Sequence, residues 1–134
     1  MPDESLLEPT GRWVFVYGTL RKGGSNDITR LSPPPRFVGP ARVAGALYHL
    51  GAYPGVTLGG TQWVHGEVYA IDAALESVLD EIEGLGAQPT DEYLKREIDV
   101  DVGGRSLPCL VYEINPRYVL SAPRIDHGDW IKLV

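Results

Sequence analysis

Cysteine is nearly absent, since Cys109 is the only one, and the sequence therefore excludes an internal disulfide. Cys109 lies in the apolar run Leu107 to Tyr112, where a buried, inert thiol is expected. Basic runs are also missing: the formal net charge is −6, and the one local cluster, Arg21-Lys22, is too small to hold a nucleic-acid backbone. We therefore expect no nucleic-acid partner.

Long hydrophobic runs are absent as well. No stretch approaches the roughly 20 apolar residues that span a bilayer, and Met1 to Thr10 is acidic and polar, without the apolar core of a signal peptide. These absences predict a cytoplasmic protein with no membrane partner. The histidines show no metal-ligand spacing, so we expect no metal site on His49, His65 and His127.

What is present indicates one globular domain. The composition is 43% hydrophobic and 22% charged over 134 residues, which suits a single folded unit of common size. Residues 1–11, rich in Pro, Asp, Glu and Ser, are expected to be a disordered leader, and residues 12–134 the domain.

The clearest predicted helix covers residues 72–83. Asp72 can cap its N-terminus, and Gly84 is a natural stop after its C-terminus. Apolar residues recur inside it at helical spacing, namely Leu75, Val78, Leu79 and Ile82.

The other predicted elements are short strands separated by Gly-rich turns. Strand-like runs cover 13–17, 37–38, 43–50, 61–70, 98–102 and 107–114, and a short helix is expected near 27–31. Gly103-Gly104 predicts a tight hairpin between the last two strands. Many short strands with one good helix indicate a β-rich α+β fold.

The first strand ends abruptly at Tyr17-Gly18-Thr19-Leu20, directly before Arg21 and Lys22. Without a Cβ, Gly18 can adopt backbone angles closed to other residues and let a ligand approach. Consecutive backbone N–H groups in such a turn can hold a carboxylate or an oxyanion. A turn that only ends the strand is the alternative interpretation of these four residues.

Five segments, in order, resemble the γ-glutamylcyclotransferase-like (AIG2-like) family. They are the turn at 17–20, the stretches 45–55, 66–69 and 79–84 (the last followed by Tyr93 and Arg96), and Gly128-Asp129-Trp130. The resemblance implies a small closed mixed β-barrel of about six strands with helices packed outside. It also implies an enzyme that converts a γ-glutamyl amine or amino acid into 5-oxoproline and a free amine, without a cofactor.

The resemblance makes Glu83 the expected general base. Glu83 lies at the helix C-terminus, and both the helix dipole there and a partly enclosed pocket disfavour an anion and should raise its pKa. Periodicity alone does not separate it from Glu76, and spacing alone favours a solvated glutamate; the match of Glu83-Gly84 to the family segment favours Glu83.

The predicted substrate contacts come from the turn and from two tyrosines. The backbone N–H groups of Gly18, Thr19 and Leu20 are expected to hold the substrate's anionic group. The two tyrosines, Tyr93 and Tyr112, are candidate pocket walls or else core residues with satisfied hydroxyls, and Tyr53 is a weaker candidate. Tyr17 is expected either to cap the end of the strand or to line the pocket.

Two alternatives of other classes stay open. One is a non-catalytic small-molecule binding module on the same fold, and the other is a γ-glutamyl amide hydrolase that uses water as the nucleophile. The loop 85–92 is long and polar for the family, so the leaving group could be an amino acid, an ε-lysine-type amine, glutathione or another amide. We expect a monomer or a weak homodimer.

Overall fold

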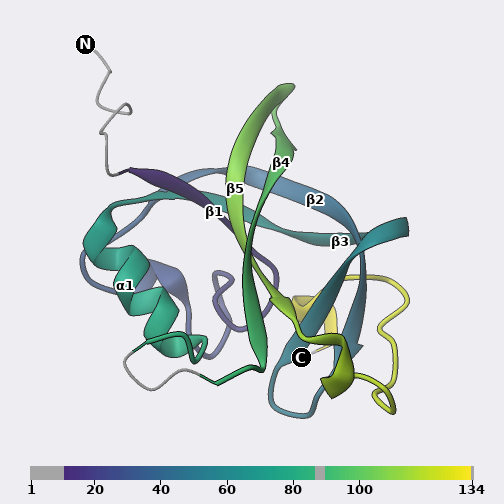
Figure 1. Cartoon of the computed structure of the whole chain (residues 1–134). Coiled ribbons are helices and arrows are strands. Elements are labelled where there is room, and N and C mark those ends of the chain that lie inside the picture. Colours follow the sequence, from purple (N-terminus) through teal and green to yellow (C-terminus); the bar gives the residue numbers. More distant parts are fainter. Residues whose placement is uncertain (1–10, 87–89, 134) are drawn as a thin grey trace.

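The computed structural model describes residues 11–86 and 90–133, and it contains one five-stranded sheet and one α-helix (Figure 1). The sheet order is β2-β3-β1-β5-β4, and every neighbouring pair is antiparallel except β1 with β5. The strands are β1 (Arg12–Val16), β2 (Arg36–His49), β3 (Pro54–Ile71), β4 (Tyr93–Val102) and β5 (Arg105–Ile114). The helices are α1 (Ala73–Ile82) and the short 3-10 turns η2 (Ile28–Arg30), η3 (Pro116–Tyr118) and η4 (Trp130–Leu133).

The expectation of a closed six-stranded barrel is wrong, because the sheet is open and has β2 and β4 as its edges. The sheet curls strongly, and Gly39 of β2 lies so close to β4 that an added Cβ would sit 2.8 Å from Val102 Cγ1. No ladder joins the two edges among the described residues. Pro40, which cannot donate to a ladder, is therefore tolerated in edge strand β2.

The strands are also fewer and longer than the sequence predicts. β2 has 14 residues and continues through Gly39-Pro40, and β3 has 18 and begins at Pro54, before the strand predicted at 61–70. Ala44 pairs with Trp63 but Gly45 pairs with Leu58, so residues 59–62 are looped out of β3 without ending it. Glycine in the left-handed region makes that loop possible, because Gly59 and Gly60 have φ values of 97° and 92°.

The helix and the hairpin confirm their sequence predictions. Asp72 is the N-cap of α1 and accepts a hydrogen bond from the Leu75 N–H at 2.9 Å. Gly103-Gly104 forms the two-residue turn between β4 and β5, where Val102 pairs with Arg105. Among the described residues, no helix is both long and apolar enough to cross a bilayer.

The sheet buries side chains on both faces. On the face toward α1, Val14 and Val16 of β1 pack with Leu75 and Leu79 of the helix. The alternate residues of the strands form a second cluster on the inside of the curl, which includes Cys109. Burial raises the pKa of the Cys109 thiol to about 12, which fits the inert role expected for it.

Arg21, which directly follows the turn at residues 17–20, forms two ion pairs inside the fold. Its guanidinium donates to Glu67 at 2.6 Å and to Asp129 at 2.6 Å, and only 12% of the side chain is exposed. The ion pairs join the end of β1 to β3 and to the C-terminal segment. The positive charge of Arg21 is therefore neutralised by carboxylates of the protein itself.

We expect Arg21→Leu to lower the free energy of unfolding by about 3 kcal/mol, because it leaves two largely buried carboxylates without their shared cation. Chemical denaturation monitored by circular dichroism measures the change. Lys22→Leu is the matched control, since the neighbouring Lys22 side chain is exposed. Equal stability of the two variants would contradict the structural role of Arg21.

Candidate active site

A cavity of about 230 Å³ lies where β1 ends, beside the start of β3, the end of α1 and the start of β4. It gathers every site residue predicted from the sequence, although these residues span nearly 100 positions of the chain. They are Tyr17, Gly18, Thr19, Leu20, Glu83, Tyr93 and Tyr112. Tyr53, the weaker candidate, also lines the cavity, together with residues that were not predicted, among them Pro54, Thr90 and Glu92.

The backbone fixes Glu83 at the C-terminal end of α1. The Gly84 N–H bonds to the Glu81 carbonyl at 3.1 Å, and the Leu85 N–H bonds to the Asp80 carbonyl at 2.7 Å. With Gly84 in the left-handed region at φ 79°, these two bonds form a Schellman motif. The motif holds the Glu83 backbone rigidly and leaves its side chain to line the cavity.

Glu83 is a carboxyl group that resists ionisation. Removal of its side chain from water is the largest influence, and the nearby negative charge of Glu92 is the second; together they raise the pKa of Glu83 to about 7. The sequence predicts a raised pKa from the helix terminus and from a partly enclosed pocket. Burial is the larger of the two causes found here, and the second is the neighbouring carboxylate of Glu92 rather than the helix terminus.

The turn after β1 presents backbone donors with no protein partner. Its carbonyl groups are occupied: Gly18 O accepts from the Arg21 N–H at 3.0 Å, and Thr19 O accepts from the Asn26 N–H at 2.9 Å. By contrast, within the part of the chain that the structure describes, the N–H groups of residues 18–20 donate to no other protein group. Such donors at a cavity wall can bind an anion.

Glycine at position 18 has a different cause from the expected one. Gly18 does not have a positive φ, so no unusual backbone angle requires it. The requirement is space, because an added Cβ would lie 2.6 Å from Cγ and 2.9 Å from Cδ of Pro54. Gly18 therefore lets Pro54 of β3, rather than a ligand, approach the backbone closely. This contact places Pro54 on the cavity wall.

The three predicted tyrosines line the cavity and have their hydroxyl groups engaged in the fold. Tyr17 donates to the Tyr112 carbonyl at 2.7 Å, and Tyr93 donates to the Pro54 carbonyl at 2.7 Å. Tyr112 donates to Asp80 Oδ1 at 2.7 Å. The two interpretations left open by the sequence are thus combined, since these side chains are both cavity walls and satisfied structural groups.

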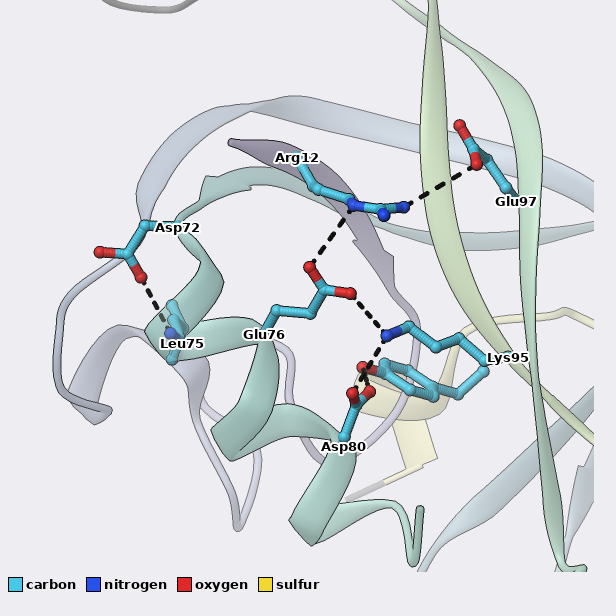
Figure 2. A network of polar contacts seen from close by, with 8 residues as sticks. Arg12, Asp72, Leu75, Glu76, Asp80, Lys95 and Glu97 are labelled. Atoms are coloured by element: carbon cyan, nitrogen blue, oxygen red, sulfur yellow. Dashed lines mark hydrogen bonds and ion pairs between the residues drawn. The ribbon is translucent and has the colours of Figure 1, made fainter. Parts of the chain in front are cut away.

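A charged network joins α1 to β1 and β4 (Figure 2), and the Tyr112 hydroxyl bonds to one of its members, Asp80. Lys95 of β4 donates to Asp80 at 3.0 Å and to Glu76 at 2.5 Å. Glu76 also meets Arg12 of β1 at 3.5 Å. Helical periodicity could not decide which of Glu76 and Glu83 is the candidate base. The structure distinguishes them, because Glu76 is paired with cations whereas Glu83 lines the cavity.

Glu92 and Tyr53 form the part of the site that the sequence analysis missed or ranked low. The Tyr53 hydroxyl donates to Glu92 Oε2, and the rings of Tyr53 and Tyr93 lie 6.4 Å apart. A signal was available: Glu92 directly precedes Tyr93, at the end of the polar 85–92 loop.

Two of the three histidines, His49 and His127, accept hydrogen bonds from backbone N–H groups two residues ahead of them. His49 Nδ1 accepts from the Gly51 N–H at 3.1 Å, and His127 Nδ1 accepts from the Asp129 N–H at 3.2 Å. Over residues 11–86 and 90–133, no group of three or more His, Cys, Asp or Glu residues is arranged to hold a metal ion.

Comparison with known proteins gives consistent matches over this fold. The sequence profile described as gamma-glutamyl cyclotransferase, AIG2-like, matches residues 14–132. A Vibrio cholerae protein provisionally named a gamma-glutamylcyclotransferase is 36% identical, over 90% of this chain and 96% of its own length. The Escherichia coli gamma-glutamylcyclotransferase family protein YtfP is 37% identical, over 88% of this chain and 95% of its own. The crystal structure of an AIG2-like protein from Mus musculus matches with a TM-score of 0.72 at 25% identity, over 90% of this chain and 88% of that one.

We expect Gly18→Ala to destabilise the fold by about 1–3 kcal/mol, because the new methyl group overlaps Pro54. Thermal and chemical denaturation measure the effect. Pro54→Ala removes the overlapping Cγ and Cδ atoms, so the double variant should recover part of the loss, as a double-mutant cycle would show. Purely additive effects would mean that Gly18 is needed for a reason other than this contact.

Proposed function

Because this chain belongs to the gamma-glutamyl cyclotransferase, AIG2-like family, we propose that it converts a γ-glutamyl amine or γ-glutamyl amino acid into 5-oxoproline and a free amine. One observation carries the proposal: a carboxyl group with a pKa of about 7, that of Glu83, shares a small cavity with a row of unoccupied backbone N–H groups. The first is suited to move a proton, and the second to hold an anion.

In the proposed reaction the substrate's own α-amine is the nucleophile. The Glu83 carboxylate accepts a proton from the α-ammonium group, and the amine nitrogen then attacks the γ-carbonyl carbon to close a five-membered ring. The carbonyl oxygen becomes an oxyanion, and collapse of this tetrahedral species breaks the bond to the leaving nitrogen. The proton held by Glu83 passes to that nitrogen, and the ring nitrogen gives up its second proton to the released amine, which leaves as an ammonium ion. The enzyme thereby returns to its starting state.

A pKa near the working pH suits both halves of this cycle, because Glu83 must first accept and then donate a proton. The amides of residues 18–20 are proposed to bind the substrate's α-carboxylate or the developing oxyanion. Preorganised donors of this kind are worth about 3 kcal/mol in a transition state. The cavity walls formed by Tyr93 and Tyr112 would hold the substrate folded, with its amine against its carbonyl.

We expect Glu83→Gln to reduce kcat at least about 100-fold, because it keeps the shape of the side chain and removes the proton acceptor. The fold should survive, since a neutral amide replaces a carboxyl that burial already disfavours as an anion. The assay is formation of 5-oxoproline from a panel of γ-glutamyl compounds, followed by chromatography. Glu97→Gln is the matched control, because Glu97 is exposed on β4 outside the cavity.

The products also separate the competing functions. Free glutamate in place of 5-oxoproline would mean hydrolysis by water. Saturable binding of γ-glutamyl compounds without any product would mean a binding module. Glu83→Gln activity within tenfold of the parent protein would contradict the role of Glu83.

The dependence of kcat/KM on pH should show an acid limb with a midpoint near pH 7. Glu83 must be ionised to act as a base, so activity falls as the pH drops through its raised pKa of about 7. Glu92→Gln should move the midpoint to lower pH, because loss of a neighbouring negative charge makes Glu83 easier to ionise. Rate profiles of the parent protein and this variant test both statements. A limb near the ordinary glutamate pKa of 4.5 would contradict the assignment.

A further inference from the structure

The charged residues of the cavity are all of one sign. Glu83 and Glu92 line it, and among the residues that the structure describes no lysine or arginine does. The inference drawn from this imbalance rests on the proposed function and concerns the part of the substrate that leaves.

The cations nearest in sequence to the lining residues are occupied elsewhere. Arg21 is held by Glu67 and Asp129. Lys95 is held by Glu76 and Asp80 (Figure 2) and is not among the residues that line the cavity. A negatively charged leaving group would therefore find no cation on the cavity wall.

Glu92 is held in place on both sides of its peptide unit. Its carbonyl accepts from the Asn115 N–H at 2.8 Å, and its own N–H donates to Thr90 Oγ1 at 3.4 Å. The Tyr53 hydroxyl donates to Oε2 of the side chain. Within the described residues no hydrogen bond is made by Oε1, so half of this carboxylate is open to a ligand.

A comparison of the charges on the substrate with those on the cavity wall indicates what the open Glu92 carboxylate would bind. In the proposed reaction, the γ-glutamyl part of the substrate brings one ammonium group, which faces Glu83, and one carboxylate, which the amides of residues 18–20 can bind. Glu92 is then left without a counter-charge. Only the leaving group can supply one, and the cavity offers apolar surface for its carbon chain at Ile82 and Leu20.

We propose that Glu92, oriented by Tyr53, makes the site selective for γ-glutamyl amides whose leaving amine carries a second, positively charged group. Substrates with a neutral leaving group are used less well, and those with an anionic one least. Glu92 is a specificity residue in this proposal, and Tyr53 positions it.

Three γ-glutamyl amides of equal chain length test the proposal. Their leaving amines are 1,4-diaminobutane, pentylamine and 5-aminopentanoate, which end in an ammonium group, a methyl group and a carboxylate. We expect kcat/KM to fall in that order, by about tenfold or more per step. The advantage of the ammonium probe should shrink as salt is raised, because salt screens charge pairs.

The variant Glu92→Gln should remove the preference for the ammonium probe over the methyl probe. The preference is read as the ratio of the two kcat/KM values, measured above the acid limb of both proteins, so that the effect of Glu92 on the ionisation of Glu83 cancels. Tyr53→Phe should reduce the same preference in part. An equal loss for all three probes would overturn the proposal, because Glu92 would then act on the shared γ-glutamyl part. Equal use of the three probes by the parent protein would also overturn it.

A last measurement keeps this inference separate from the proposed function. Calorimetric binding of the three probes to Glu83→Gln ranks their affinities without turnover. The order ammonium, methyl, carboxylate supports the role of Glu92 even if no 5-oxoproline forms with the parent protein, an outcome that would contradict only the proposed reaction. Probes that bind equally would contradict the role of Glu92.

Discussion

The rest of the structure depends on the central position of β1, which is hydrogen-bonded to β3 on one side and to β5 on the other. The two ladders have unequal lengths. Pairing with β3 continues to Val16, whereas pairing with β5 is limited to Trp13 and Val14. Beyond Val14, β1 and β5 are no longer paired, and the cavity lies at that end of β1. The Tyr17 hydroxyl spans the separation, since it donates to the Tyr112 carbonyl and accepts from the Val56 N–H at 3.3 Å.

Several motifs by which the sequence resembles the family hold the strands around β1 together and do not line the cavity. Gly66 lies so close to β1 that a Cβ would be 2.0 Å from the Val16 carbonyl oxygen, and Gly128 lies equally close to the Trp63 carbonyl. Glu67 and Asp129 receive the two ends of the Arg21 guanidinium. Residues far apart in sequence thus hold the turn that carries the backbone donors.

The sequence predicts well what depends on local periodicity and turn chemistry. The stripe through Leu75 and Leu79 gave α1, and Gly103-Gly104 gave the hairpin, because both signals are complete within a few residues. Whether the sheet closes depends on how far long strands curl, which no local pattern records. The contact of Gly18 with Pro54 and the approach of Glu92 to Glu83 likewise exist only after distant segments meet.

The raised pKa of Glu83 has a consequence for the balance between folded and unfolded chains. The folded protein holds the Glu83 proton up to about pH 7, whereas an unfolded chain releases it near 4.5. Between these values the folded state binds more protons, so this group's contribution to stability is intact below pH 4.5 and is lost as the pH rises to 7. The loss is at most about 3 kcal/mol, since part of the side chain still meets solvent. A carboxyl group suited to neutral-pH proton transfer therefore weakens the fold most under the conditions in which it would work.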